Sequence, residues 1–412
     1  MSLIDDLLMT LAPDGVPFYT LAEIATTVPG LSGKTKNDFS DGNARFVSYM
    51  NAFANLAVDQ MAMDFVKVGP GEKQNELRKG DVVITGSSES VDEIGMSSVV
   101  IEEPAEALYL NSFCFALRFE NSALLLPGFS KYLFRSNVVR DQIRRSASGV
   151  TRINISKPRF MKVRIPVPPI EVQREIVRIL DQFTQLEAEL EAELEARRRQ
   201  YDHYAGLLLT NDENVLRVKF GDVATIVRGA SPRPIQKFIT DASDGVPWIK
   251  IGDVPARGKY ITGAAQCVTP EGAAKSRRVS AGDFVLSNSM SFGRPYISKI
   301  EGYIHDGWLA ISDFDASFAP DYLYYLLRSA PIQEEFARRA GAGTVKNLNA
   351  EIVRSVEVPV PSMERQYRVV DLLDKFDALV NDLSTGLPAE LGARRKQYEY
   401  YRDKLLTFTE AK

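Results

Sequence analysis

The sequence has little of what secreted, membrane and most catalytic proteins depend on. Its 412 residues include two cysteines, Cys114 and Cys267, which are too few for a disulfide framework or a zinc site. Two histidines are present: His203 lies among helical tyrosines, and His305 lies in a His-Asp-Gly turn, so neither resembles a general base. No apolar run is long enough to cross a bilayer, and the N-terminus lacks the basic segment of a signal peptide. These absences predict a reduced, cytoplasmic protein.

Motifs for nucleotide binding and methyl transfer are also missing. Residues 30–35 have the sequence GLSGKT, but a phosphate-binding P-loop needs four residues between its glycines and this segment has two. No G-x-G-x-x-G motif is present. The paired prolines Pro168-Pro169 lie between Val167 and Ile170, which does not match the Asn/Asp-Pro-Pro-aromatic motif of amino-methyltransferases. The sequence therefore predicts a chain that binds and does not catalyse.

The chain does contain a duplication. Thr151–Phe183 and Thr344–Phe376 align at an offset of 193 residues, and 12 of their 33 positions are identical. Arg197–Tyr204 returns as Arg394–Tyr401, with four additional residues between the two matches. Fainter echoes link Phe18–Gly30 with Val218–Ala230 and Lys79–Ser87 with Ala281–Ser289. A period near 200 residues is far longer than the unit of a solenoid, so the sequence predicts a duplicated domain together with its following helix.

Each half carries a long helical pattern in which apolar and aromatic residues recur at steps of three and four. The first helix should begin after Pro168-Pro169 and span about 60 Å at 1.5 Å per residue, whereas Ser384–Pro388 should interrupt the second. Because a lone helix of this length would expose its apolar side, we expect the two to pair as an antiparallel coiled coil. The predicted seam comprises Ile176, Ile179, Phe183, Leu186, Leu190, Leu194, Arg197, Tyr201, Tyr204 and Leu208, and then Val369, Leu372, Phe376, Leu379, Leu383, Leu391, Arg394, Tyr398, Tyr401, Leu405 and Phe408.

Between the helices, Gly15–Ser148 and Val215–Gly341 have short β-like runs separated by Gly, Ser and Asn, and each ends in one amphipathic helix. This pattern predicts two α+β domains. Leu7–Thr10 echoes Leu207–Thr210, so the N-terminal helix should complete the second long helix and bring the termini together, unless the echo is a coincidence between Leu-rich helix ends. The expected strands are Asp81–Thr85, Ser112–Phe119, Trp248–Ile251 and Asp283–Ser287, and the expected domain helices are Gly128–Arg145 and Pro320–Arg339. The predicted boundaries are 1–13 for the N-terminal helix, 14–164 for the first domain, 165–211 for the central helix, 212–357 for the second domain and 358–412 for the C-terminal helix.

The order of these segments resembles the specificity subunit of type I restriction–modification systems. The resemblance covers the whole chain, and its strongest motif is IPVPPIEVQREI at Ile165–Ile176 with its counterpart VPVPSMERQYRV at Val358–Val369. One departure is Val150 before Thr151, where the second half keeps the family's glycine as Gly343. The resemblance implies an α+β fold with a pseudo-twofold internal repeat, in which two target recognition domains are joined by two long antiparallel coiled-coil helices.

The same resemblance implies a function and a set of partners. Each domain would bind one half of a bipartite, asymmetric target on double-stranded DNA. The helices would set the spacing and dock two modification (methyltransferase) subunits, and restriction or translocase subunits could join them. The chain itself would bind no cofactor, whereas its partners would use S-adenosylmethionine, and ATP with Mg if a restriction subunit takes part.

Physical considerations agree with this interpretation and identify candidate contacts. Two half-sites on one face of a duplex lie about 34–36 Å apart or at a multiple of that distance, which a long helical support can span. The net charge of −4 means that DNA contact would depend on local basic patches. Polar and basic loop residues are the candidates, because Arg and Lys bind guanine and Asn and Gln bind adenine in the major groove; each could instead be a solvated surface residue. The candidates are Lys34, Lys36, Arg45, Ser87, Ser88, Thr151 and Arg152 in the first domain, and Arg233, Lys250, Ser289, Ser291, Arg294, Thr344, Lys346 and Asn347 in the second.

Two other classes of function remain open. A free-standing DNA-modifying enzyme would transfer methyl groups as an isolated chain, although it would have to do so without the usual motifs. A coiled-coil structural adaptor would lack sequence-specific retention on duplex DNA even when its partner subunits are present.

Overall fold

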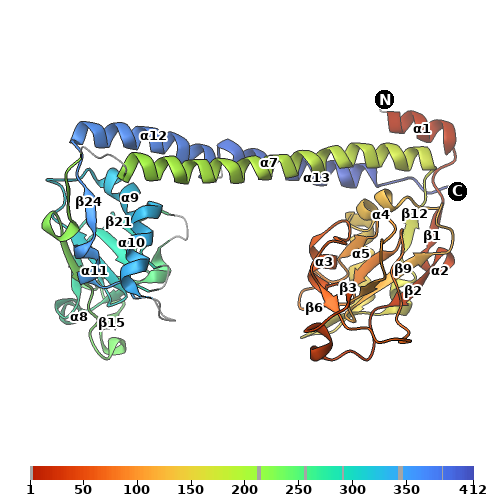
Figure 1. Ribbon diagram of the computed structural model, residues 1–412, viewed down its shortest axis with the longest axis horizontal. Helices are drawn as coiled ribbons and strands as arrows, with labels where there is room; N and C mark the ends of the chain where they lie inside the picture. The colour runs from red at the N-terminus through yellow and green to blue at the C-terminus, as the bar shows by residue number, and fades with distance from the viewer. Residues whose placement is uncertain (1–2, 211–214, 255–257, 290–291, 342–346, 383) are drawn as a thin grey trace. The chain divides into compact units, whose positions relative to one another are not determined.

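The computed structural model describes residues 3–210, 215–254, 258–289, 292–341, 347–382 and 384–412. The chain divides into two compact units. Unit 1 comprises Met1–Leu190 and Leu391–Lys412, and unit 2 comprises Glu191–Glu390. Each unit holds one mixed domain together with parts of the long helices (Figure 1). Among the described residues, no helix combines the length and the apolar character that crossing a membrane requires.

The domain of unit 1 is built around a central strand that is buried on both faces. Val82 and Ile84 of this strand, β5 (Val82–Thr85), pack with the domain helices, whereas Val83 packs in a second cluster on the opposite face. This alternation follows from the two-residue repeat of a strand. One sheet has the order β2 (Ala25–Pro29), β9 (Cys114–Phe119), β5 and β7 (Ser97–Val99), and the other has β4 (Phe65–Val66), β3 (Ala44–Val47) and β8 (Leu108–Leu110).

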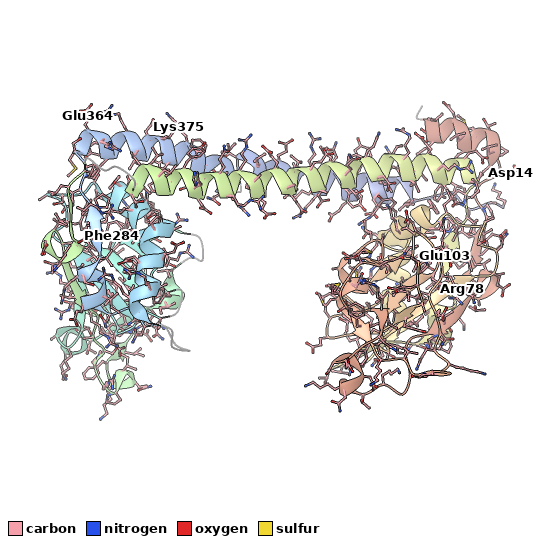
Figure 2. All side chains as sticks on the ribbon, in the orientation of Figure 1. Asp14, Arg78, Glu103, Phe284, Glu364 and Lys375 are labelled. Atoms are coloured by element: carbon pink, nitrogen blue, oxygen red, sulfur yellow. The ribbon has the colours of Figure 1, made fainter. Side chains whose placement is uncertain are left out.

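Unit 2 repeats this topology. One sheet of unit 2 has the strand order β14, β23, β20 and β21, which matches the order β2, β9, β5 and β7 of unit 1. The parallel pair β16–β22 of the other sheet corresponds to the parallel pair β3–β8. Phe284, the first residue of β20, is fully buried (Figure 2). The duplication therefore extends through the domains, where the sequence shows it only faintly. The strands of unit 2 are β14 (Thr225–Arg228), β23 (Trp308–Ser312), β20 (Phe284–Ser287), β21 (Pro295–Ser298) and β17 (Tyr260–Ile261) in one sheet, and β15 (Ile239–Thr240), β18 (Gln266–Val268), β16 (Val246–Ile249), β22 (Gly302–Ile304) and β19 (Arg277–Val279) in the other.

The helix predicted at the end of each domain is in fact a pair of helices. Unit 1 has α4 (Pro127–Leu133) and α5 (Asn137–Ser146), and unit 2 has α9 (Pro320–Arg328) and α10 (Ala330–Ala340). In each pair, a buried serine with extended backbone lies between the two helices, Ser136 in unit 1 and Ser329 in unit 2. The serine hydroxyl donates to the backbone carbonyl three residues earlier at 2.7 Å. Such a side-chain bond to the backbone competes with helix continuation, which hydrophobic periodicity does not reveal.

The long helices form as predicted, and α7 (Ile170–Thr210) runs for 41 residues. The expected interruption is present between α12 (Met363–Asn381) and α13 (Gly386–Leu405), where Gly386 has a φ of 68°. Within unit 1, the Phe183 ring stacks on Tyr401 with centroids 5.5 Å apart, and Glu187 pairs with Arg395 at 2.6 Å. Because residue numbers rise along α7 as they fall along α13, the two helices pack antiparallel.

The predicted seam is only partly right. Leu186, Tyr204, Leu372 and Leu379 are between 37% and 49% exposed. The buried face of α7 is broader than the predicted seam, because Val172 and Leu180 pack in the core of the first domain together with the predicted Ile176. Leu383 lies outside the described residues. Buried helix positions that the stripe does not include are Val172, Leu180, Ala205, Leu209, Val370, Leu373, Val380 and Leu406.

The N-terminal helix α1 (Leu3–Leu11) packs beside the end of α13, as the sequence echo predicts. Its buried Ile4 belongs to the same apolar cluster as Leu406. The amide of Val16 donates to the carbonyl of Thr409, and the carbonyl of Val16 accepts from Ala411, both at 2.9 Å. These contacts bring the two ends of the described chain together inside unit 1.

The glutamine of the repeated motif joins each domain to its helix. The buried Gln173 amide accepts from the amide of Leu126 at 2.9 Å and donates to the carbonyls of Leu124 and Pro168 at 3.0 and 2.9 Å. Gln366 makes the equivalent three bonds in unit 2, to the amide of Ala319 and to the carbonyls of Ser317 and Pro361. The identity of these two glutamines across the duplication is therefore a structural requirement.

A tyrosine–aspartate bond reinforces the junction in both halves. The Tyr132 hydroxyl donates to Asp181 at 2.6 Å, and the Tyr325 hydroxyl donates to Asp374 at 2.5 Å. Burial and the neighbouring carboxylate raise the pKa of both tyrosines well above the ordinary value, so each hydroxyl stays a donor. Both bonds link the first domain helix, α4 or α9, to the long helix that follows the domain.

Phe183→Ala should destabilise the protein by about 2 kcal/mol, less than the 3–5 kcal/mol expected for a fully buried phenylalanine, because the ring is half-buried against Tyr401. Thermal and urea unfolding would measure the change. Leu186→Ala is the matched control, since Leu186 is 37% exposed on the same helix. Equal losses in the two variants would show that Phe183 contributes no specific packing.

Candidate nucleic-acid interface

In unit 1, three segments meet at the end of the central strand. The amide of Gly86, just after β5, donates to the carbonyl of Phe113 at 2.8 Å, and the carbonyl of Gly86 accepts from the amide of Ile155 at 3.0 Å. Around this point β10 (Ala147–Ser148), β11 (Ile153–Ile155) and β6 (Ser87–Ser88) form a three-stranded sheet. We call this arrangement of three hydrogen-bonded segments the frame. It lies on the side of the domain away from β1 (Phe18–Thr20) (Figure 1).

The frame of unit 1 presents basic and aromatic side chains. The Arg152 guanidinium lies 4.9 Å from the centre of the Phe113 ring, which is 53% exposed, and donates to the Ser87 hydroxyl at 3.4 Å. The Lys157 ammonium lies 5.3 Å from the centre of the Phe115 ring. An open pocket of about 470 Å³ collects these residues with Gly86, Ser112, Cys114, Asn154 and Ile155, and none of the residues that line it carries a carboxylate. Of the predicted residues, the buried Ser87 and the exposed Arg152 meet here, and Thr151 is exposed next to Arg152 in the same turn.

Unit 2 repeats the frame with different side chains. The amide of Asn288, just after β20, donates to the carbonyl of Gly307 at 3.1 Å, and its carbonyl accepts from the amide of Leu348 at 2.7 Å. Here the exposed group is the carboxylate of Asp306, which accepts from the Ser231 hydroxyl at 2.8 Å. That hydrogen bond lowers the pKa of Asp306, so the carboxylate stays charged.

Other polar groups surround Asp306. The guanidinium of Arg233, whose side chain is 84% exposed, approaches the Asp306 carboxylate at 3.5 Å. Burial lowers the pKa of the adjacent His305, so its imidazole is neutral at physiological pH. Predicted residues Ser289 and Asn347 are both exposed next to the frame. The two domains therefore share a backbone arrangement and differ in the chemistry that it displays.

Three predicted residues of the first domain have partners within the domain. The Lys34 ammonium pairs with Glu72 at 2.5 Å, and the Lys34 side chain is only 8% exposed. The Arg45 guanidinium binds Glu106 at 2.7 Å and lies over the Phe65 ring. Both arrangements favour a structural role over a DNA contact, and neither pairing is visible in the sequence because the carboxylates lie 38 and 61 positions away. Lys36 is exposed at the start of a short 3-10 helix, and the Ser88 hydroxyl accepts from the amide of Ser90.

The predicted residues of the second domain also differ in their surroundings. Lys250 binds the side chain of Gln266 at 2.9 Å and is half-buried. Ser291, Thr344 and Lys346 lie outside the described residues. The backbone of Arg294 pairs with Ser287, directly before the frame residue Asn288, and its side chain lines a second pocket.

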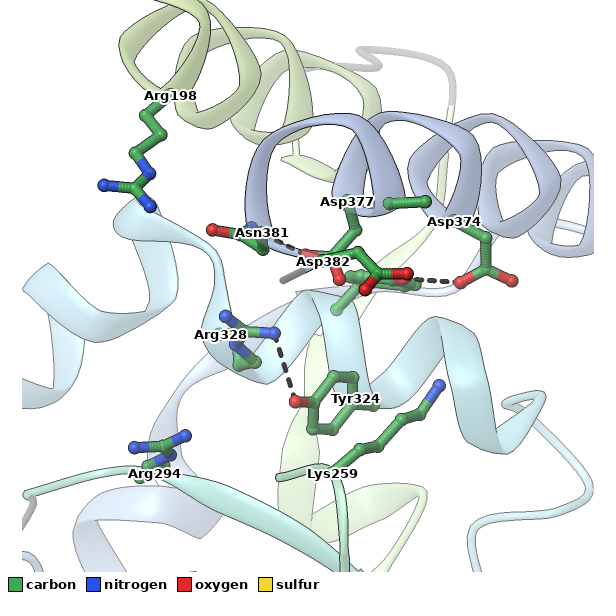
Figure 3. Close-up of a pocket in the computed structure, with 11 residues that line it drawn as sticks. Arg198, Lys259, Arg294, Tyr324, Arg328, Asp374, Asp377, Asn381 and Asp382 are labelled. Carbon is green, nitrogen blue, oxygen red and sulfur yellow. Dashed lines mark hydrogen bonds between the residues drawn. The ribbon is translucent and has the colours of Figure 1, made fainter. Parts of the chain in front are cut away.

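This second pocket, of about 700 Å³, lies between α9, α12 and the C-terminal half of α7 in unit 2 (Figure 3). Arg198, Arg294 and Arg328 follow one wall, and the Arg328 guanidinium donates to the Tyr324 hydroxyl at 3.1 Å. The Arg294 guanidinium lies 5.4 Å from the Tyr296 ring. Asp377 on α12 accepts from Asn381 at 2.9 Å. The pocket therefore has mixed charge, with arginines beside the carboxylates of Asp374, Asp377 and Asp382.

If Arg294 contacts a DNA phosphate, Arg294→Ala should weaken DNA binding uniformly across sequences and reduce the salt dependence of binding by about one ion. Titrations of the assembled complex with cognate and altered duplexes at several salt concentrations would measure both. A loss of about 1–3 kcal/mol confined to one base-pair position would instead identify Arg294 as a base contact.

No group of three His, Cys, Asp or Glu side chains in the described part of the chain is arranged to hold a metal ion. Cys114 is buried and Cys267 is partly buried, and both are free thiols. Burial raises the pKa of the Cys114 thiol to about 12, so it is a poor nucleophile.

Comparison with known proteins assigns the chain to a family. The model of the type I restriction modification DNA specificity domain matches residues 13–196 and again residues 212–393. The chain belongs to this family. Each of the two matches covers one domain and the beginning of its helix, as the duplication requires.

Individual specificity-family proteins support the assignment. A Haemophilus influenzae protein assigned as a type I restriction enzyme specificity subunit is 33% identical over 273 residues, which are 64% of this chain and 68% of that protein. The EcoR124I/EcoR124II specificity subunit of Escherichia coli is 32% identical over 264 residues, 60% of this chain and 63% of that subunit. The chain thus spans just under two thirds of the length of the E. coli relative.

Two solved structures share the fold. A chain from a type I restriction–modification system whose complex assembly has been studied has a TM-score of 0.71 at 17% identity, with 95% of this chain and 97% of that chain covered. The HsdS subunit of Thermoanaerobacter tengcongensis has a TM-score of 0.52 at 18% identity, with 96% and 97% covered. The predicted α+β fold with an internal repeat is confirmed.

Several residues of the frames escape sequence reasoning. Phe113 in unit 1 and Ser231 and Asp306 in unit 2 come from segments that the duplication does not align, whereas Asn154 and Lys157 lie in the aligned segment, opposite Asn347 and Ala350. Phe113 lies inside the predicted strand Ser112–Phe119, but the observed β9 begins one residue later, at Cys114, and the Phe113 ring is exposed. In unit 1 the pairing of β11 with β6 brings Asn154 next to Ser87, and in unit 2 a hydrogen bond joins Ser231 to Asp306, 75 positions away.

Proposed function

We propose that this chain is the DNA-recognition subunit of a type I restriction–modification complex and that it binds a bipartite, asymmetric target. Each domain would bind one half of the target through its frame. The observation that carries the proposal is the shared frame with unlike side chains: Arg152 on Phe113 in unit 1, and Asp306 with Ser231 in unit 2. A common backbone supports a common mode of docking, and different side chains favour different bases.

The helices would dock two modification subunits. Apolar side chains remain exposed along them, which a helix without a partner would rarely keep. Two copies of the partner follow from the duplication, because each half supplies similar helix surfaces. Restriction or translocase subunits would join this assembly in a complete system. The exposed positions are Leu186, Tyr204 and Leu207 on α7, Tyr367, Leu372 and Leu379 on α12, and Tyr400 and Tyr401 on α13.

Catalysis would belong to the partners. The modification subunits would bind S-adenosylmethionine and transfer the methyl group, and a restriction subunit would use ATP with Mg. This chain would supply target choice and the distance between half-sites, and it would bind no cofactor itself. The absence of methyltransferase and nucleotide-binding motifs from the sequence supports this division of labour.

Sequencing of methylated bases in a methylation-deficient host tests the proposal directly. Co-expression of this chain with its modification subunit should produce methylation at one bipartite motif, and neither protein alone should produce it. Methylation by the isolated chain would instead identify an enzyme. Methylation of the same motif without the chain, and no selective retention of the complex on duplex DNA, would indicate a structural adaptor.

A further inference from the structure

We propose that Arg152 recognises a guanine in the half-site bound by the first domain and that Phe113 is the residue that positions it. This inference rests on the proposed function, which it deepens by naming a base and the side chains that select it. Arg152 would be a specificity-determining residue, and Phe113 would act through it.

Arg152 is held in place by its backbone. It lies in the turn between β10 and β11, which pair antiparallel through Ala147 with Ile155 and through Ser148 with Asn154. Gly149 in the same turn has a φ of 132°, and a Cβ built on it would lie 2.1 Å from the carbonyl oxygen of Arg152. The turn therefore packs tightly against the backbone of Arg152, and β11 is in turn fixed by its pairing with β6.

The side chain of Arg152 is oriented as well. The guanidinium packs on the exposed Phe113 ring at 4.9 Å and donates one hydrogen bond to the Ser87 hydroxyl at 3.4 Å. Packing against an aromatic ring leaves the remaining N–H donors at the edge of the guanidinium available. The pocket around it has no carboxylate among its lining residues that could compete for those donors.

A guanine fits this arrangement better than a phosphate does. The fork of two N–H groups matches O6 and N7 of guanine in the major groove, and a guanidinium fixed on a ring favours one plane of approach. Lys157, by contrast, is a point charge at the border of the same pocket and is suited to a phosphate. The pocket thus combines an oriented base contact with a less oriented backbone contact.

Comparison of the two halves shows that Arg152 is not one of the residues kept across the duplication. Residues that join each domain to its helix are kept across the duplication, as Gln173 and Gln366 are. Arg152 aligns with Val345, so its charge belongs to one half only. In the frame of unit 2 the corresponding loop carries Asp306, which accepts from Ser231 and pairs with the exposed Arg233. The two frames therefore present different sets of polar groups, which predicts different bases in the two half-sites.

The test is to map the methylated motif for variants of the full chain co-expressed with its modification subunit. Arg152→Gln should relax one guanine position of one half-site, with roughly a 5- to 150-fold loss of discrimination there, and should leave the other half-site unchanged. Arg152→Lys keeps the charge but loses the fork, so it should relax the same position. Phe113→Ala should relax that position partly, and Phe113→Tyr should restore it because the ring is kept.

The control is Arg78→Gln, an exposed arginine on the opposite side of the same domain from β6 (Figures 1 and 2). It should leave the motif unchanged, and every variant should unfold at the temperature of the parent protein. A bipartite motif that stays identical in Arg152→Gln, or methylation that weakens equally at all sites and is rescued by Arg152→Lys, would overturn the inference and identify a phosphate contact. No bipartite motif from the parent protein would overturn the proposed function itself.

Discussion

Replacing Gln173 by leucine should destabilise unit 1 by about 3–5 kcal/mol. The amide side chain is fully buried and bonds to three backbone groups, those of Leu124, Leu126 and Pro168. Leucine fills a similar volume but leaves these groups without a partner, and each unsatisfied buried polar group costs about 1–3 kcal/mol. The loss should appear in urea unfolding and as faster amide exchange at Leu126.

Gln366→Leu is the internal comparison, because it removes the same three bonds in unit 2. It should cost a similar amount, with faster exchange at Ala319 and normal exchange at Leu126. Arg174→Ala, at an exposed position adjacent to Gln173, is the surface control and should change stability by less than about 0.5 kcal/mol. A Gln173→Leu protein as stable as the Arg174→Ala protein would refute the structural role of the motif.

Exchange of the first domain for a homologous domain should change one half of the target completely and leave the other half intact. The structure corrects the segment to be exchanged: the predicted Gly15–Ser148 ends between β10 and β11 and would leave Arg152 behind. The exchange should extend to Ser156, so that the whole hairpin moves with its domain. Methylated-motif mapping would report the result, and a change in both half-sites would show that the two domains bind DNA as one composite surface.

Insertion of four residues near Glu193 is the converse control for this exchange. The site lies within the uninterrupted α7, where four residues add about 6 Å of helix. The preferred spacer between the half-sites should lengthen, and the bases of both half-sites should persist. A changed half-site with an unchanged spacer would contradict the role of the helix in setting the distance.

Much of this fold could be predicted because its signals are local or repeated. The glutamine, the prolines and the aspartate of the motif recur at a fixed offset, and α7 follows from a long apolar period. The exact buried face could not be predicted, because Val172 and Leu180 face a domain whose position no periodicity reveals. The division of each domain helix at Ser136 and Ser329 also depends on a local hydrogen bond that competes with the helix.

The candidate interface could be predicted less completely than the fold, because its residues come together only in the folded chain. Lys34 and Arg45 look like free cations in sequence, but long-range pairing gives each a carboxylate partner. Arg152 could be named because the duplication marks its position, whereas Phe113 and Asp306 lie in turns, where the Phe113 carbonyl accepts from the amide of Gly86 and the Asp306 carboxylate accepts from Ser231. A charge is visible in a sequence, but its partner becomes visible only in the folded chain.

Unit 1 is built from two segments that lie far apart in the sequence, and this affects the order in which the protein folds during its synthesis. Leu406 belongs to the same core as Phe129 and Leu180, although more than 200 residues separate it from them in the sequence. Val16 likewise hydrogen-bonds to Thr409. The first domain therefore emerges from the ribosome early but lacks part of its core until more than 200 further residues have been made, a delay of about 10–40 s at 5–20 residues per second. Unit 2 is contiguous, from Glu191 to Glu390, so it can complete its core first. A ribosome-bound chain stalled before α13 should thus hold a protease-resistant second domain and a first domain that is still open at the site where α13 will pack.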